Sequence, residues 1–296
     1  MLGKIFLSLW VISWLRLSSA GLEVYYSPGQ ERLARMINQE MSGLISVLEK
    51  ELNLKIPPPL KVIIAQSPEQ FQAIQTGKVP EWAVATANPE QGVIYLKPYP
   101  GGGYSELIHI CKHELVHIYL YQKLLGHRAP RWFEEGMAEM FSAGFSLERI
   151  WALAGAGLGR EFIPFSELER NFPASPSRAR LAYYQSEDFV GFLSELLGTD
   201  GFQSLLERLS RGEDFYQALF SLTGKDFFQL EKSWQKRVKY HYGFVLIFSG
   251  SGSLWFLVSL LFILAYLKKR RQAELKKQLL ELEDKFYKIQ EGKRWD

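Results

Sequence analysis

The sequence predicts an α+β domain in which a sheet lies beside a helical half, followed by one C-terminal transmembrane helix. Three observations favour this arrangement. Within residues 21–241, strand-like segments come first and helix-like segments follow, which indicates separate rather than alternating layers. These roughly 220 residues have a suitable length for one domain. Beyond them, residues 242–267 contain no charged side chain.

The composition is typical of a folded protein. Of 296 residues, 47% are apolar and 23% are charged, which excludes disorder along the whole length. The net charge of +3 is too small to suggest a nucleic-acid-binding protein, so we expect no nucleic-acid partner. The single cysteine, Cys111, excludes an intramolecular disulfide and a four-cysteine zinc site.

Residues 1–20 have the layout of a secretory signal peptide. A short basic segment precedes Ile5–Leu15, which is mostly apolar. Small residues at Ser18-Ser19-Ala20 are suitable for cleavage after position 20. The apolar core is too short for an ordinary membrane helix. An uncleaved anchor is the alternative, because Arg16 lies close to the cleavage site.

The elements of the domain follow from local patterns. Apolar residues at helical spacing predict the first helix, Pro57-Pro58-Pro59 separates it from the next strand, and Asn88-Pro89-Glu90 predicts the turn of a hairpin. Strands are expected at residues 22–26, 60–65, 81–87 and 92–96, and helices at 31–52, 67–74 and over most of the chain from 105 onward.

Residues 242–267 are predicted to cross a membrane. At about 1.5 Å per residue, this segment exceeds the roughly 30 Å of the hydrocarbon layer. Lys268-Lys269-Arg270-Arg271 follow directly, as in a stop-transfer flank. Basic residues also precede the segment, so the signal peptide decides the orientation. We expect the domain in the periplasm or outside the cell and the tail in the cytoplasm, with a buried helix of a soluble protein as the alternative.

The tail, residues 268–296, has a net charge of +4, from ten basic and six acidic residues. This charge can contact anionic membrane lipid. Five apolar residues have heptad spacing over barely two heptads, which is short for a coiled coil. The tail is therefore predicted to be an amphipathic helix beside the membrane or a weak homodimer contact, through Leu275, Leu279, Leu282, Phe286 and Ile289.

Two histidines on one helix carry the predicted chemistry. The segment His113-Glu114-Leu115-Val116-His117 lies in a stretch with helical spacing, so both histidines project from one face and can bind one zinc ion. Glu114 can then take a proton from zinc-bound water as a general base. His109 lies one turn earlier; it is expected to pack or to support a ligand, because a fourth protein ligand would close the site.

A second helix can complete the ligand set, since a catalytic zinc has three protein ligands and one open position. Residues 130–139 read Pro-Arg-Trp-Phe-Glu-Glu-Gly-Met-Ala-Glu. Glu135 and Glu139 are four residues apart and share a helix face, so either can point at the metal. Glu134 points elsewhere and is expected in solvent.

The two motifs together resemble those of the gluzincin zinc metallopeptidases. His113–His117 is followed, after 17 residues, by Glu135-Gly136-x-Ala138, and the phrase Trp-Phe-x-Glu-Gly-x-Ala-Glu is particularly similar to the peptidase-MA-like domain family. The resemblance covers about residues 60–240. It implies a small mixed sheet, Glu135 as the third zinc ligand, and Glu139 behind it, hydrogen-bonded to a ligand histidine. An exchange of these two roles remains open.

The same resemblance implies a tyrosine that stabilises the oxyanion and an edge strand that binds the substrate backbone. Residues 182–186, Ala-Tyr-Tyr-Gln-Ser, resemble a segment of that family, with Tyr184 as the first choice and Tyr183 as the second. Either tyrosine could instead pack in a helical core. The edge strand would be Trp82–Ala87 or Val93–Leu96.

Together these features predict a membrane-anchored zinc metallopeptidase that hydrolyses peptides or proteins by means of zinc-bound water activated by Glu114. The alternative is a catalytically inactive, membrane-tethered binding or sensory protein on a peptidase scaffold. The presence of the base and of all three candidate ligands, His113, His117 and Glu135, argues against the alternative.

Overall fold

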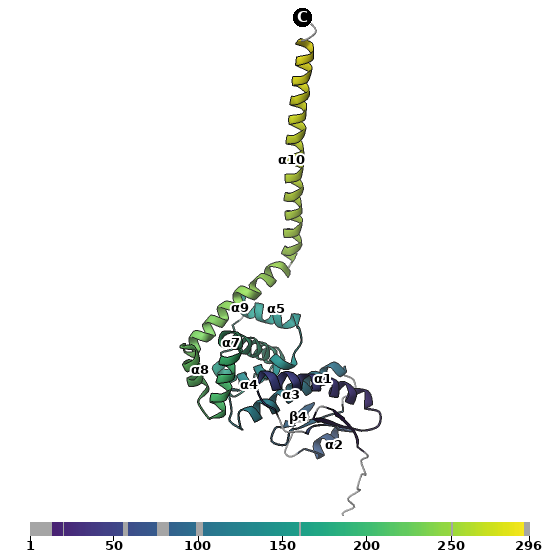
Figure 1. Ribbon diagram of the computed structural model, residues 1–296, viewed down its shortest axis with the longest axis vertical. Coiled ribbons are helices and arrows are strands. Elements are labelled where there is room, and N and C mark those ends of the chain that lie inside the picture. Colours follow the sequence, from purple (N-terminus) through teal and green to yellow (C-terminus); the bar gives the residue numbers. More distant parts are fainter. Residues whose placement is uncertain are drawn as a thin grey trace, which may run out of the picture. The chain divides into compact units, whose positions relative to one another are not determined.

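The computed structural model describes residues 14–19, 21–55, 59–75, 83–98, 103–159, 161–249 and 251–292. The chain divides into two units, and the boundary in the sequence lies between Lys239 and Tyr240. The first unit contains the sheet and most of the helices, and the second contains the long C-terminal helix (Figure 1).

The described strands form one mixed sheet in the order β1-β2-β3-β5-β4. The three inner strands run parallel, and each outer strand is antiparallel to its neighbour. Alternate residues of β2 and β3 are buried, as the two-residue period of a strand requires. The bounds are β1 Leu15–Ser19, β2 Leu22–Tyr26, β3 Leu60–Ile64, β4 Ala85–Asn88 and β5 Val93–Leu96.

Helices cover both faces of the sheet. On one face lies α1 (Glu31–Glu51), whose buried residues form an apolar stripe, together with α3 (Tyr104–Lys123). On the other face, Phe71 of the short helix α2 (Pro68–Ala73) packs against Val93 and Tyr95. Figure 1 shows α2 and α1 on opposite sides of the strands. The sheet therefore has an apolar core on each face.

The helical half of the first unit contains α3 and the helices that follow it up to Lys239. α4 packs along α7, and α3 lies against α4. Gly198 interrupts the helical dihedral angles within α7. The bounds are α4 Arg131–Ser142, α5 Leu147–Leu158, α6 Phe165–Leu168, α7 Pro176–Ser210, α8 Phe215–Thr223, α9 Phe227–Ser249 and α10 Ser251–Gly292.

An aromatic cluster around Trp132 forms the core of this half. The Trp132 side chain is fully buried, and its ring centroid lies 4.8 Å from that of Phe165 and 5.2 Å from that of Phe189. Further rings from α8 and α9 surround it, those of Phe215 and Phe227. Because Trp132 lies in the first turn of α4, close in sequence to the glutamates of the second motif, this core holds that helix in place.

The predicted α+β architecture with a small mixed sheet is confirmed, and each predicted strand and helix of the domain has a counterpart. One strand was not predicted. β1 lies within the segment assigned to the signal peptide, pairs with β2, and joins Arg16 to Glu23 by an ion pair of 3.1 Å. The signal peptide stays a prediction, and cleavage after position 20 would remove this strand.

The predicted transmembrane segment, residues 242–267, is divided between the end of α9 and the start of α10. Among the residues that the structure describes, no helix combines the length and the apolarity that a membrane span needs. The transmembrane helix is therefore not confirmed. The tail is helical up to Gly292, and its contacts with lipid or with a second copy stay predictions.

Candidate metal centre

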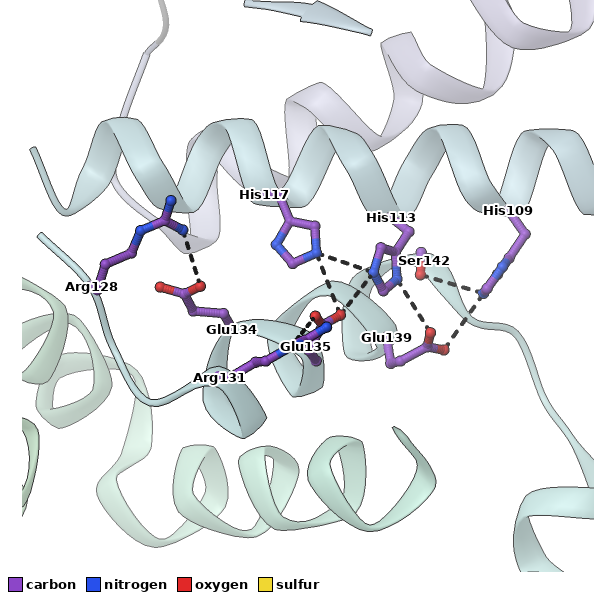
Figure 2. A network of polar contacts seen from close by, with 9 residues as sticks. All are labelled: His109, His113, His117, Arg128, Arg131, Glu134, Glu135, Glu139 and Ser142. Carbon is purple, nitrogen blue, oxygen red and sulfur yellow. Dashed lines mark hydrogen bonds and ion pairs between the residues drawn. The ribbon is translucent and has the colours of Figure 1, made fainter. Parts of the chain in front are cut away.

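Three side chains from two helices converge on one point. His113 and His117 lie one turn apart on α3, and their Nε2 atoms are 3.1 Å apart. Glu135 comes from α4, with Oε2 at 3.3 Å from Nε2 of His113 and 3.6 Å from Nε2 of His117. Figure 2 shows the three side chains pointing toward one another between the two helices.

This triangle has the dimensions of a zinc site. A tetrahedral ion with bonds of about 2.0–2.1 Å separates its ligand atoms by about 3.3 Å. The three distances of 3.1, 3.3 and 3.6 Å match the edges of such a tetrahedron. Two imidazole nitrogens and one carboxylate oxygen are also a usual donor set for catalytic zinc. The residues present therefore fit the metal, and one tetrahedral position is left for another ligand.

Glu139 lies behind the first histidine rather than at the centre. Its Oε1 is 3.2 Å from Nδ1 of His113, and its Oε2 is 3.6 Å from Nε2 of His109. Burial alone would raise the pKa of Glu139, but hydrogen bonds from His109 and His113 outweigh burial and lower it to about 2. A carboxylate at Nδ1 keeps the proton there and leaves Nε2 free to bind metal. The geometry thus places Glu135, and not Glu139, beside the Nε2 atoms of both histidines, and Glu135 as the third ligand stays a prediction.

Glu114 is close to both the metal triangle and the strand β4. Burial raises the pKa of Glu114, opposed by His117, by His113 and by a hydrogen bond from the backbone of Ala87 in β4. A carboxylate with a raised pKa is better suited to accept and return a proton near neutral pH. The residue predicted as the base is therefore in a suitable environment for that role.

The two candidate tyrosines face different neighbours. The ring centroid of Tyr183 is 6.4 Å from that of His113. Burial and nearby carboxylates, Glu135 first among them, raise the pKa of Tyr183 to about 12, so its hydroxyl stays protonated at neutral pH. Tyr184 instead hydrogen-bonds Ser146, next to α5. Tyr183, the second choice from the sequence, therefore has its ring beside His113, and the oxyanion role of either tyrosine stays a prediction.

A pocket of about 500 Å³ opens beside the metal triangle. Its wall includes Glu114, His117 and Glu135, together with Ala87 of β4. Because β4 is at the edge of the sheet, it is the candidate for binding an extended backbone. The other candidate, Val93–Leu96, is β5, an inner strand. Trp82 lies outside the described residues.

Glu134 also lines this pocket, so its expected position in solvent was wrong. Its side chain is only 16% exposed, and it accepts a hydrogen bond of 3.2 Å from the backbone N–H of Ala129. The carboxylate thereby satisfies a backbone donor in the turn before α4. This local contact at the start of α4 outweighs the hydration that the sequence pattern suggested.

A close contact between α4 and α7 explains the glycine after Glu135. A Cβ atom on Gly136 would lie 2.5 Å from the carbonyl oxygen of Ser186 and 2.8 Å from Cγ2 of Val190. Only a residue without a side chain lets the two helices approach this closely. Gly136 therefore sets the position of Glu135 relative to α7, which carries Tyr183.

The sheet, the two helices and the His-His-Glu triangle define the scaffold of a metallopeptidase. The comparison with known families agrees: the model of a family described as the Peptidase MA superfamily matches residues 41–240, so the chain belongs to that family. This membership indicates a peptidase-type hydrolase whose substrates are peptides or proteins. No curated protein matches the chain.

Proposed function

We propose that this chain is a zinc-dependent metallopeptidase in which His113, His117 and Glu135 hold the metal. The observation that carries the proposal is the triangle of ligand atoms at 3.1–3.6 Å, with Glu114 beside it. The family is generally zinc-dependent, which supports the choice of metal.

The surrounding residues have complementary roles in this proposal. Zinc, when bound, supplies Lewis-acid polarisation of the scissile carbonyl and lowers the pKa of water. Glu114 accepts a proton from the attacking water and returns it to the leaving amine. The hydroxyl of Tyr183 donates a hydrogen bond to the oxyanion that develops on the substrate. The edge of β4 pairs with the substrate backbone, which gives affinity with little sequence preference.

The test is metal content and hydrolysis in the full-length protein, purified in detergent. We expect about one zinc ion per chain, loss of peptide hydrolysis when a chelator removes the zinc, and recovery when zinc is added back. His117→Ala should abolish both zinc binding and hydrolysis, because it removes one of three ligands. A folded wild-type protein that takes up no added zinc and hydrolyses no peptide would instead favour the inactive binding protein.

The two tyrosines give a paired prediction. Tyr183→Phe removes the hydroxyl but keeps the ring, so we expect kcat to fall by about 10²-fold, as for the loss of one oxyanion donor. Tyr184→Phe is the matched control, because its hydroxyl faces Ser146 and kcat should stay close to that of the wild type. Equal losses of kcat in the two variants would contradict the assignment.

We propose in addition that the apolar C-terminal segment holds the domain at a membrane, with the domain on the extracytoplasmic side. Support comes from α10, where Trp255–Leu267 contains large apolar residues that are exposed in the structure, followed by four basic residues. We expect the full-length protein to remain in membranes washed at alkaline pH, and a chain that ends at residue 241 to be released. Release of both proteins would contradict the anchor.

A further inference from the structure

Arg131, the first residue of α4, was not predicted as part of the site. Its side chain lies one turn before Glu135, and its Nε atom is 3.3 Å from Oε1 of that glutamate. The other oxygen of the same carboxylate, Oε2, is the one that faces both histidines. Figure 2 shows Arg131 approaching the glutamate from the side away from His113 and His117. The two oxygens of Glu135 thus have different partners.

The loop between α6 and α7 holds the Arg131 side chain in this position. The backbone N–H of Arg131 donates to the carbonyl of Glu169 at 3.2 Å, and its Nη1 donates to the carbonyl of Arg170 at 3.3 Å. The guanidinium carbon also lies 5.3 Å from the centroid of the Phe172 ring, within the range of a cation–π contact. The planar guanidinium therefore has partners on several sides, although the side chain is 43% exposed.

The same loop reaches the candidate oxyanion donor. The ring centroids of Phe172 and Tyr183 are 4.8 Å apart, and Tyr183 lies next to His113. Arg131 and Phe172 thereby connect Glu135 to Tyr183 by direct contacts. None of these three residues belongs to the metal triangle.

We propose that Arg131 is a positioning residue that makes Glu135 a one-oxygen ligand, by binding Oε1 so that Oε2 alone is directed at the metal. The proposal rests on the metal site proposed above. One oxygen from Glu135, rather than two, leaves the coordination position that water and substrate need. Residues that orient metal ligands by hydrogen bonds typically change metal affinity or activity by about 10–100-fold when they are mutated.

The sign of the effect on zinc affinity separates this role from simple electrostatics. Arg131 is a cation near a site for a cation, so removal of its charge alone would strengthen zinc binding. If Arg131 orients the ligand, its removal weakens zinc binding instead. A measurement of zinc affinity in the metal-free protein thus tests the role without relying on catalysis.

The experiment measures the dissociation constant of Zn²⁺ by competition with a chromophoric chelator, for the full-length protein and its variants in detergent. We expect Arg131→Ala to raise this constant by about 10–100-fold. Arg131→Gln keeps an N–H donor one turn from Glu135 and should recover a large part of the loss. The matched control is Arg128→Ala, because Arg128 lines the same pocket but pairs with Glu134 at 3.4 Å; its zinc affinity should stay within about twofold of that of the wild type.

The thermal midpoint of each metal-free variant shows whether folding is preserved, and Arg131→Gln keeps the test informative if Arg131→Ala folds poorly. Unchanged or tighter zinc binding in Arg131→Ala, or an equal loss in Arg128→Ala, would overturn the positioning role while leaving the proposed peptidase intact. Failure of the folded wild-type protein to bind Zn²⁺ would overturn both.

In active preparations, we expect Arg131→Ala at saturating zinc to reduce kcat more than it raises KM, because Arg131 acts on the metal ligand.

Discussion

Replacement of Glu114 by glutamine is expected to reduce kcat for peptide hydrolysis by about 10²–10⁴-fold, the usual contribution of a general base. The amide has nearly the same shape as the carboxylate, and its oxygen can keep the hydrogen bond from the backbone of Ala87. The glutamine amide, however, cannot accept the proton of the attacking water. Because Glu114 is not one of the three residues proposed to hold the metal, zinc content should remain at the wild-type level.

The control is Glu134→Gln, which alters another carboxylate of the same pocket. Glu134 accepts a hydrogen bond from the backbone N–H of Ala129, and the side-chain oxygen of a glutamine can accept the same bond. The Glu134→Gln variant should therefore keep a kcat close to the wild-type value. Both variants are compared by steady-state kinetics on one fluorogenic peptide and by elemental analysis of bound zinc. Undiminished turnover in Glu114→Gln would show that another group acts as the base.

Gly136→Ala is expected to lower the free energy of unfolding by about 1–3 kcal/mol, the usual cost of overpacking a filled interior. The new methyl group would lie 2.5 Å from the carbonyl oxygen and 2.7 Å from the carbonyl carbon of Ser186. These are backbone atoms of α7, so they can yield only if the helix moves. The steric effect acts against the preference of a helix interior for alanine over glycine, which is about 1 kcal/mol.

Gly191→Ala provides the control on α7 itself, because a Cβ atom there has no neighbour within 4 Å. It should leave stability unchanged or raise it by up to about 1 kcal/mol. Urea unfolding of the metal-free proteins, followed by circular dichroism, measures both changes. If Gly136→Ala gained as much stability as Gly191→Ala, then α4 and α7 would separate without cost, and Gly136 would not set their distance.

Features that depend on neighbours within one helix or strand could be predicted from the sequence. The four-residue spacing of His113 and His117 places both imidazoles on one face of α3, whatever that helix packs against. Strand and helix periods likewise predicted β2, β3 and α1 close to their observed bounds. Arg131 could have been found in the same way, because it lies four residues before Glu135.

The choice between similar residues depended on how the elements pack. Glu135 and Glu139 share a face of α4, so the position of that helix along α3 decides which one reaches both histidines. Tyr183 and Tyr184 point about 100° apart on α7, so the rotation of α7 decides which one faces the metal.

The sequence by itself thus determined the chemical groups and their spacing within each element, because helix and strand geometry is local. Tertiary structure alone decided that Glu135 and Tyr183 lie beside His113 and that β4, rather than β5, lies at an edge of the described sheet. The physical reason is that these relations join residues from separate elements. Their relative positions follow from close contacts such as that of Gly136 with Ser186, which no local pattern specifies.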